Sequence, residues 1–400
     1  MMPNKMSDND VLIAGATRLP TGKFLGGLSG FTAPQLGAIA IREALRRAEV
    51  KPELIEDVIM GNVVQAAEGQ APARQAALGA GLPSAVSALT INKVCGSGLQ
   101  AVMLSANAII AGDAEVMIAG GMESMSNAPY ALPKARTGYR MGNAEMLDTV
   151  VHDGLWCAFE NHHMGMSAEI IAEKFEISRQ AQDEFAASSH AKAVKAIESG
   201  AFKREISPVE IKGKKGSIFF DSDEPVRPDT STDTLSRLAP IFKPGSGTVT
   251  AGNAPGLSDG ASAMVVLSRA AANKYGIAPQ ARVTGYASVG IEPKYIFAAP
   301  PFAVKKLLER TGLKLSDFDL IEVNEAFAAQ ALANIKETGM DISKVNIRGG
   351  AVALGHPIGA SGAKILTTLI HALQDTGGKR GLVTLCLGGG GAVALSIELI

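Results

Sequence analysis

The stretches AIREALRRAEVKPELIEDVI (residues 40–59) and AVKKLLERTGLKLSDFDLIEV (303–323) follow the same pattern, 263 positions apart and without a gap. In both, apolar residues recur at helical spacing, a turn follows, and a short apolar strand ends the segment. Two copies of one helix–turn–strand unit in a single chain indicate an internal duplication. The fold is therefore predicted to consist of two related halves.

Two further pairs of segments continue the repeat in the same order. GSG at 96–98 precedes a helix, as does ASG at 360–362, and AEVMIAGG, ending at Gly121, corresponds to GLVTLCLGG, ending at Gly389. The strands are continuous apolar runs, as expected when helices cover both faces of a sheet. We therefore expect an α/β fold built from two duplicated halves.

The region between the repeats has a different composition. Residues 122–247 are rich in Met, Pro, His and charged residues, whereas the sequence from 248 returns to the style of the core. Such an insertion is typical of a segment that covers a ligand. We expect an N-terminal half formed by 1–121 plus 248–274, an inserted loop domain at 122–247, and a C-terminal half at 275–400.

Composition excludes several classes of function. The formal net charge of −1 gives no basis for a nucleic-acid partner. No apolar run is expected to reach the ~18–20 residues that span a bilayer, so no membrane partner is predicted. The polar start MMPNKMSDND and the end SIELI carry no recognisable targeting signal. Three cysteines, an odd and sparse number, favour reduced thiols and a cytoplasmic location.

Cys95 lies at a turn between an apolar strand and a helix, in NKVCGSG. Most free cysteines are small buried hydrophobic residues, and that alternative stays open for Cys95 taken alone. At the start of a helix, however, the dipole lowers a thiol pKa, and free N–H groups can stabilise an oxyanion. The position therefore favours a nucleophile.

His356 lies in a glycine-rich loop at the repeat position that corresponds to the Cys95 turn. A lone histidine is more often structural, but the pseudo-twofold relation between the halves predicts that the two turns face each other. A base beside a thiol is the usual means of activating a cysteine nucleophile.

Cys386 and Asn324 each follow an apolar strand of the second half. Cys386 is either a core residue or part of a ligand site, since the glycines after it allow close backbone approach. Asn324 either caps the next helix or serves a ligand at the strand's carboxyl edge. A nucleotide-binding or dehydrogenase loop is rejected, because the required glycine spacing followed by a helix is absent.

Together these motifs resemble the thiolase family. The resemblance runs from about residue 10 to the C-terminus and includes NKVCGSG, NEAF, GHPIGASG, CLGGG, GGMESMS and TVTAGN. It implies the thiolase fold, two duplicated αβαβα halves that form a five-layered core with an inserted loop domain. It also implies acetyl-CoA C-acetyltransferase activity, which is condensation of two acetyl-CoA to acetoacetyl-CoA plus CoA, and the reverse thiolysis, through an acyl-Cys95 intermediate.

The resemblance also implies the roles of individual residues. Cys95 is the nucleophile, His356 its base, and Cys386 the second acid or base. Asn324 holds a water that, with His356, stabilises the enolate, while the N–H groups of Cys95 and Gly388 stabilise the tetrahedral intermediate. Coenzyme A is substrate and product, and no metal or redox cofactor is expected.

Substrate binding is assigned by the same resemblance, with departures. Many relatives carry Ser in the stretch that here reads GNAPG. Pro255 has no hydroxyl, so the contact to pantetheine is either lost or taken over by Ser258 or by backbone. Apolar bulk at 295–303 makes the acyl-chain preference an open question. Assembly as a homotetramer, or a homodimer, is expected. The residues assigned to substrate binding are Arg227, His163, Met164, Ser258, Leu155 and Phe327.

Two alternatives to the main hypothesis stay open. The first is a degradative 3-ketoacyl-CoA thiolase of broader chain length, against which Met164 and the HHMG segment argue. The second, from a different class, is a non-catalytic acyl-CoA- or lipid-binding relative. That relative would lack at least one of the four polar groups on Cys95, His356, Asn324 and Cys386, and all four are present. Ketoacyl synthases share the duplication but would lack Cys386.

Overall fold

Two halves of one large sheet are related by the duplication. The computed structural model describes residues 8, 10–213 and 216–400, and its 10-stranded sheet has the order β14-β15-β16-β13-β1-β12-β5-β3-β4, with β2 paired to β12. The strands of the first half are β1 (Val11–Arg18), β2 (Gly22–Lys23), β3 (Asp57–Gly61), β4 (Ser87–Ile91), β5 (Val116–Ser124) and β12 (Ser258–Ser268). Those of the second half are β13 (Ala281–Gly290), β14 (Leu320–Val323), β15 (Arg380–Leu387) and β16 (Gly391–Leu399).

The strand pairings repeat outward from the joint between the halves. At the joint, β1 pairs antiparallel with β13. Moving outward, β12 and β5 are antiparallel and β5 and β3 parallel in one half. In the other half, β16 and β15 are antiparallel and β15 and β14 parallel. The duplication inferred from sequence is therefore present in the topology, with β4 as an extra edge strand of the first half.

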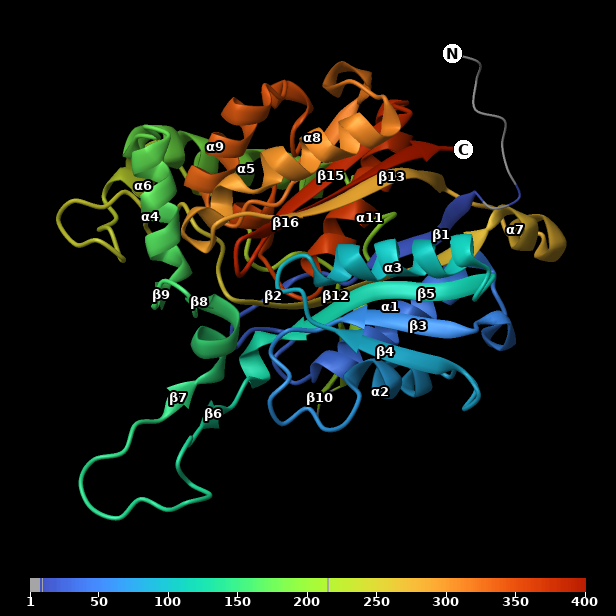
Figure 1. Ribbon diagram of the computed structural model, residues 1–400, viewed down its shortest axis with the longest axis horizontal. Coiled ribbons are helices and arrows are strands. Elements are labelled where there is room, and N and C mark those ends of the chain that lie inside the picture. Colours follow the sequence, from blue (N-terminus) through green and yellow to red (C-terminus); the bar gives the residue numbers. More distant parts are fainter. Residues whose placement is uncertain (1–7, 9, 214–215) are drawn as a thin grey trace.

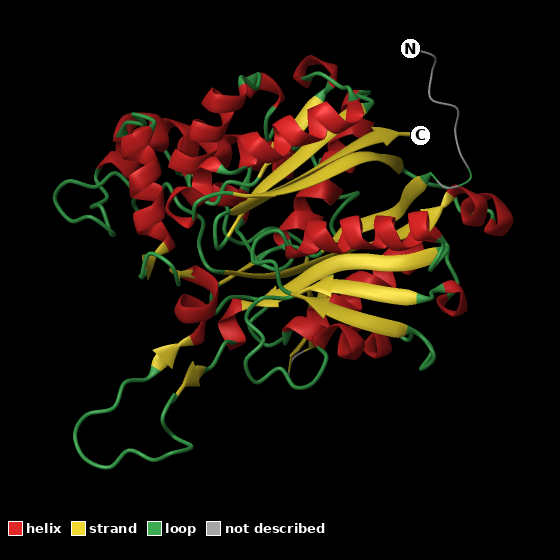
Figure 2. Cartoon of the chain, in the orientation of Figure 1, coloured by secondary structure: helices red, strands yellow, loops and turns green. Residues whose placement is uncertain are grey.

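The two halves of the large sheet lie as two separate layers, called the two sheets below. Helices cover their outer faces and fill the space between them (Figures 1 and 2). Apolar residues of α1 (Ala33–Ala48) and α2 (Pro72–Gly79) pack on the outer face of the first half. Those of α8 (Pro300–Thr311) and α9 (Ala328–Thr338) pack on the second half. Between the sheets, α3 (Ser97–Ala111) packs against α11 (Ser361–Thr376). This order of helix, sheet, helix, sheet, helix confirms the predicted five-layered fold.

Burial on both faces explains the continuous apolar strands. In β1, Leu12 and Ala14 face the layer of α1, whereas Ile13 faces the layer shared by α3 and α11. Helix α1 begins where the side chains of Thr32 and Gln35 cap each other's backbone N–H groups. A strand without polar positions is stable only between two such layers.

The segment after β5 leaves the sheet and returns with β12. It carries two long helices, α4 (Met164–Lys174) and α5 (Arg179–Glu198), and a long exposed excursion between β6 and β7. Its short elements are β6 (Tyr130–Ala131), β7 (Leu147–Asp148), η3 (Val150–Leu155), β8 (Trp156–Cys157), β9 (His162–His163), β10 (Val209–Gly213), β11 (Gly216–Phe220) and α6 (Thr232–Ser236). The remaining short elements are η1 (Pro52–Leu54), η2 (Met125–Asn127), α7 (Arg269–Tyr275), η4 (Pro293–Ala298), η5 (Leu315–Asp317), η6 (Ile342–Lys344) and α10 (Ala351–Leu354).

A buried ion network ties the inserted segment to both halves. Arg18 of β1 is fully buried and contacts Glu205 at 2.6 Å and Asp223 at 2.8 Å, both from the insertion. Glu205 also contacts Arg348 of the second half at 3.2 Å. Breaking a buried pair of this kind typically costs about 3–5 kcal/mol, because one charge is left without a partner. The network therefore fixes the insertion over the joint.

One stretch of the described chain is longer and more apolar than expected from the sequence, since no run long enough to span a membrane was predicted. Val94–Ala111 spans 18 residues and is long and apolar enough to cross a membrane. However, 56% of it is buried inside the protein, where α3 packs between the sheets. A core helix passes the same test, so the stretch is weak evidence for a membrane span.

Candidate active site

Cys95 lies at a strained turn between β4 and α3. Val94 has a φ of 47°, which is unusual for a β-branched residue. Side chains hold this conformation: Asn92 Oδ1 accepts the Val94 N–H at 3.0 Å, and Ser97 Oγ accepts the Lys93 N–H at 2.8 Å. Strain that the surroundings impose in this way is a feature of functional sites. It sets the thiol at the start of α3, as the sequence predicts.

Close packing of α3 on α11 brings the two repeat turns together. A Cβ on Gly98 would lie 2.8 Å from the backbone nitrogen of Ala363, and a Cβ on Gly362 would overlap Leu99. Only glycine allows the two helix starts to approach so closely. The loops that precede the helices, with Cys95 on one and His356 on the other, therefore line the same cavity.

The hydrogen bonds of His356 select one imidazole tautomer. Its Nδ1 lies 2.5 Å from Ser361 Oγ, which in turn donates to the Pro357 carbonyl at 2.8 Å. Since the serine proton goes to that carbonyl, Nδ1–H donates to the serine, and Nε2 is left as the acceptor. The amide nitrogen of Asn324 lies 3.4 Å from Nε2. The basic nitrogen of His356 thus faces Asn324.

Ser258 and Lys364 position the His356 loop. Ser258 Oγ accepts the backbone N–H of His356 at 3.1 Å and donates to the Gly256 carbonyl at 2.8 Å. The Lys364 ammonium donates to the carbonyls of Leu354 at 2.7 Å and Gly355 at 3.0 Å. The predicted substrate-binding residue Ser258 therefore has its hydroxyl engaged with this loop.

Asn324 and Cys386 come from neighbouring strands of the second half. Asn324 follows β14 and is 1% exposed, and its Oδ1 has no hydrogen-bond partner among the residues described. Cys386 lies near the end of β15 and is also 1% exposed. Because β14 and β15 are parallel neighbours, their carboxyl ends meet at one edge of the sheet.

Electrostatics keep the site neutral before substrate binds. Burial raises the pKa of Cys95 to about 12, although the N–H groups of Cys95 and Gly388 act to lower it. Burial, and then the nearby Lys364, lowers the pKa of His356 to about 3. Burial and the neighbouring Cys95 raise the pKa of Cys386 well above its usual range. At pH 7 the two thiols and the imidazole are therefore uncharged.

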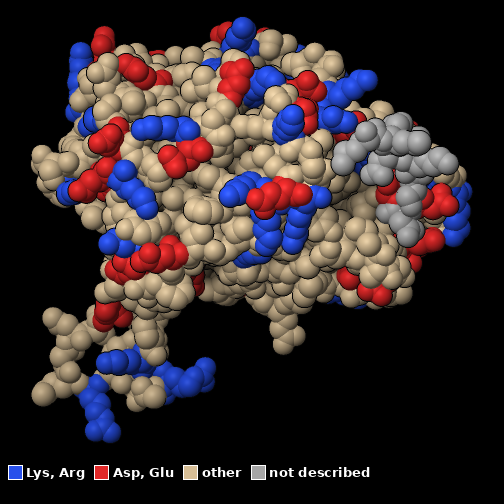
Figure 3. Space-filling model, turned by 45° about the horizontal axis from the view of Figure 1, so that its top comes forward, with Lys and Arg blue, Asp and Glu red and all other residues tan. Residues whose placement is uncertain are grey.

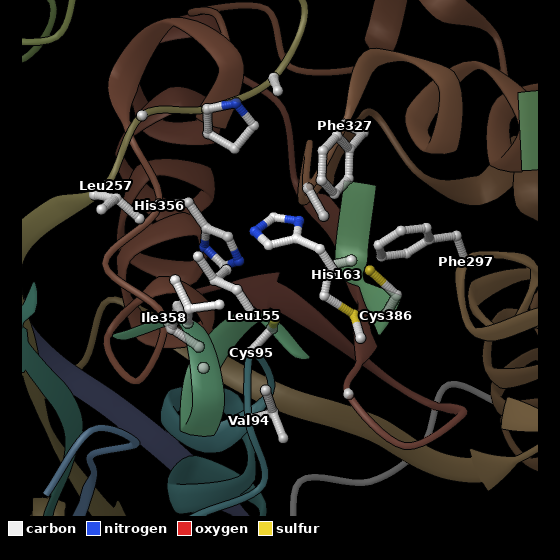
Figure 4. Close-up of a pocket in the computed structure, with 18 of the residues that line it drawn as sticks. Val94, Cys95, Leu155, His163, Leu257, Phe297, Phe327, His356, Ile358 and Cys386 are labelled. Carbon is white, nitrogen blue, oxygen red and sulfur yellow. The ribbon is translucent and has the colours of Figure 1, made fainter. Parts of the chain in front are cut away.

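These groups surround one apolar cavity of about 390 Å³ (Figure 4). Eight of the predicted site residues line it, namely Cys95, His356, Cys386, Gly388, His163, Met164, Leu155 and Phe327. Pro255, the departure noted in the sequence, also lines it. Asn324 and Ser258 do not line the cavity themselves, but each contacts His356, which does.

Arg227 is exposed and contacts His190 outside the cavity lining. Its backbone N–H donates to His190 Nδ1 at 3.1 Å, and its guanidinium lies 3.2 Å from Nε2. Burial, and then the nearby Arg227, lowers the pKa of His190 to about 4. The role of Arg227 in binding the nucleotide part of coenzyme A stays a prediction.

Sequence reasoning missed a buried carboxylate behind the site. Glu123 is fully buried, and its oxygens accept the N–H groups of Val63, Val64 and Gly359 at 2.8–3.1 Å. It therefore ties the first half to the loop that carries His356. Its motif, GGMESMS, was recognised, but nothing in a linear sequence says which of its side chains is buried.

No metal centre is found in the described part of the chain, where no group of three or more His, Cys, Asp and Glu side chains could hold an ion. The chemistry available at the cavity is that of two thiols, an imidazole, an amide and backbone N–H groups. This set suits acyl transfer by a cysteine nucleophile with a second thiol at hand.

Known proteins share this architecture over the full length. Residues 11–270 match the thiolase N-terminal domain and residues 277–399 the thiolase C-terminal domain. An acetyl-CoA acetyltransferase of Cupriavidus necator is 53% identical over 390 residues, which cover 97% of this chain and 99% of the relative. One of Pseudomonas aeruginosa is 50% identical over 389 residues, with 97% and 99% covered. The crystal structure of the Bacillus anthracis acetyl-CoA acetyltransferase superposes with a TM-score of 0.96 at 43% identity, covering 98% of this chain and 99% of that one. The chain therefore belongs to the thiolase family.

Proposed function

We propose that this thiolase is an acetyl-CoA acetyltransferase that condenses two acetyl-CoA to acetoacetyl-CoA and CoA, and that catalyses the reverse thiolysis. Relatives named for this activity are about half identical over nearly the whole chain. The observation that carries the proposal is that two thiols, Cys95 and Cys386, share one cavity with the free Nε2 of His356. One thiol is needed to hold the acyl group and the other to move a carbon-bound proton.

The first half-reaction transfers the acetyl group to the enzyme. His356 Nε2 takes the Cys95 proton as the sulfur attacks the thioester carbon of acetyl-CoA. The tetrahedral intermediate collapses, the carbon–sulfur bond to coenzyme A breaks, and the departing CoA thiolate takes the proton of Cys386. Acetyl-Cys95, an imidazolium and the Cys386 thiolate remain, and CoA leaves.

The second half-reaction forms the carbon–carbon bond. The Cys386 thiolate removes a proton from the methyl carbon of a second acetyl-CoA, and that carbon attacks acetyl-Cys95. The Cys95–carbon bond breaks, acetoacetyl-CoA is released, and the imidazolium returns its proton to Cys95. The three groups end in their starting protonation states, so the cycle needs no metal or redox cofactor.

Two sets of donors fit the oxyanions of this cycle. The backbone N–H groups of Cys95 and Gly388 hydrogen-bond to the Cys95 sulfur. They therefore lie where they can donate to the oxyanion of the tetrahedral intermediate, which supports that role. The pairing of Asn324 with His356 Nε2 supports their role at the enolate oxygen. Loss of one such donor typically costs on the order of 10²–10³ in rate.

The proposed contacts to coenzyme A follow the cavity lining. Leu155, His163, Met164 and Phe327 give an apolar channel that suits pantetheine and a short acyl group. Arg227 lies on the exposed part of the insertion, where a cation would meet the phosphates of the nucleotide. Ser258 supports binding indirectly, since it holds the His356 loop.

Assembly with other copies, as a homotetramer or homodimer, is part of the proposal. The arm between β6 and β7 projects from the body with basic side chains on it (Figure 3), and its residues 132–146 are exposed. Apolar side chains on the arm, including Leu132 (49% exposed) and Met141 (99%), support a role in contact with another chain. A cytoplasmic location is supported by three free cysteines, two of which need the reduced thiol for this chemistry.

Acetyl transfer from labelled acetyl-CoA tests the proposal. Brief incubation is expected to label Cys95 in the wild type and in Cys386→Ala, whereas Cys95→Ala stays unlabelled. Only the wild type and the control Cys157→Ala, in which a buried thiol outside the cavity lining is removed, are expected to form acetoacetyl-CoA. Labelling of Cys95→Ala at the wild-type level would refute the nucleophile. A lack of any labelling would favour the non-catalytic, lipid-binding alternative.

A further inference from the structure

Four aromatic side chains form a continuous series along the cavity, which we call the aromatic wall: His163, Phe242, Phe327 and Phe297. His163 stacks on Phe242 with ring centres 4.7 Å apart. Phe242 packs edge to face on Phe327 with ring centres 6.5 Å apart. The ring centres of Phe327 and Phe297 are 5.3 Å apart, and their ring planes are tilted by 57°. Each ring thus restricts the movement of the next, as in other packed aromatic pairs.

Phe297 ends the wall beside the reacting groups. It is 3% exposed and belongs to the same apolar cluster as Cys386 and Met164 (Figure 4). The two thiols are close enough for Cys95 to raise the pKa of Cys386. In the proposed reaction Cys95 holds one acyl group and Cys386 deprotonates the other, so the reacting carbons meet between the two sulfur atoms. Phe297 lines the same cavity and packs in the cluster of Cys386, so it borders the space that a longer acyl chain would enter.

The ring of Phe297 is held on several sides. Its segment, η4, packs against α4, α9 and β15, and small residues, Ala298 and Ala299, follow it in the chain. A ring fixed in this way gives a rigid limit to the cavity, because a packed core cannot yield without strain. Phe297 also lies on an element that carries none of the residues assigned to the chemistry.

We infer that Phe297 determines acyl-chain specificity by closing the end of the cavity against 3-ketoacyl groups longer than acetoacetyl. The inference rests on the proposed function and adds the residue that sets its substrate range. A hydrophobic pocket discriminates by about 10–200-fold for each methylene that it cannot hold. Removing the ring is therefore expected to weaken discrimination against acyl chains that are one or two carbons longer than acetoacetyl.

The test compares kcat/KM for CoA-dependent cleavage of acetoacetyl-CoA, 3-ketopentanoyl-CoA and 3-ketohexanoyl-CoA. The wild type is expected to lose about 10-fold or more per added methylene. In Phe297→Ala, the ratio of 3-ketohexanoyl-CoA to acetoacetyl-CoA is expected to rise at least about 10-fold. Phe302→Ala is the matched control, because that phenylalanine lies five positions on in α8 and is 55% exposed.

The outcomes separate the inference from the proposed function. A wild type that prefers acetoacetyl-CoA, with the same ratio in Phe297→Ala as in Phe302→Ala, overturns the role of Phe297 and leaves the function intact. A wild type that cleaves the longer substrates equally well, or none of them, overturns both. If thermal unfolding shows that the alanine variant does not fold, Phe297→Leu, which leaves a smaller void, is expected to raise the ratio in the same direction. An unchanged ratio in that variant likewise overturns the role.

Discussion

At the scale of single residues, burial rather than formal charge sets the chemistry. Cys95 and His356 are uncharged at neutral pH because the apolar surroundings of the cavity that they line desolvate both groups. A thiolate–imidazolium ion pair is therefore unfavourable in free energy before substrate binds. Once a thioester carbonyl is present, the sulfur attacks it as the proton leaves, so no free thiolate needs to persist. This keeps the thiol protonated between turnovers, when a free thiolate would be open to oxidation.

The half-buried carboxyl of Glu68 and the buried carboxyl of Glu123 predict an unusual pH dependence of stability. Burial, and then the neighbouring Glu123, raises the pKa of Glu68 to about 8, and burial raises that of Glu123 to about 7. In the unfolded chain both titrate near 4.5. Between pH 4.5 and 7–8 the folded state binds more protons, so these groups make stability fall as pH rises.

Glu68→Gln removes one of these ionisations. We expect the free energy of unfolding at pH 8 to rise by about 1–3 kcal/mol, and its slope between pH 5 and 8 to flatten, since one pKa unit is worth about 1.4 kcal/mol. Urea unfolding at several pH values measures both. Glu145→Gln on the exposed arm is the control. An unchanged slope in Glu68→Gln would contradict the raised pKa.

The sequence points to candidate reacting residues more readily than to the residues that hold them. Cys95, Cys386 and Asn324 stood out because each is a reactive or polar group that follows an apolar strand. His356 stood out because it lies at the repeat position that matches the Cys95 turn. Glu123 and Lys364 escaped notice, because the burial of a charged side chain depends on distant segments that no local pattern reveals. Phe242 and Phe297 were missed for the same reason, since each packs against Phe327 only in the folded chain.

At the scale of secondary structure, the site depends on how closely two helices approach. The starts of α3 and α11 are in contact through glycines, and this contact sets the distance between the Cys95 turn and the His356 loop. The duplication of helix–turn–strand units was readable from periodicity. The joint between β1 and β13 was not, because strand partners across a duplication are not encoded in either copy alone.

Gly98→Ala tests this helix contact. Its Cβ would lie 2.8 Å from the Ala363 nitrogen and 3.1 Å from the Gly359 carbonyl, so the helices must separate. We expect a loss of about 1–3 kcal/mol in stability and a larger proportional loss in kcat than in KM, because the two turns move apart. Denaturation and steady-state kinetics measure these effects. Gly30→Ala, with nothing within 4 Å of its Cβ, is the control, and equal behaviour of the two variants would contradict the claim.

At the scale of the whole molecule, the duplication creates the site. The first half supplies Cys95, and the second half supplies His356, Asn324 and Cys386, all at the surface where the halves meet. The insertion supplies His163 and Met164 and is fixed over the joint through Arg18. The pairing of a thiol with an imidazole is thus a consequence of placing two similar turns face to face, and β15 adds the second thiol.

Hydrogen exchange at the acetyl group tests most directly the claim that Cys95 is the nucleophile and Cys386 the base. Incubating the wild type with acetyl-CoA in deuterated water is expected to put deuterium on the methyl carbon, because the Cys386 thiolate removes that proton reversibly. Cys386→Ala is expected to acetylate Cys95 to the same final extent, more slowly because the departing CoA thiolate must take its proton from water. It is expected to incorporate no deuterium, as measured by mass spectrometry of recovered acetyl-CoA. Exchange at the wild-type rate in Cys386→Ala would contradict the account.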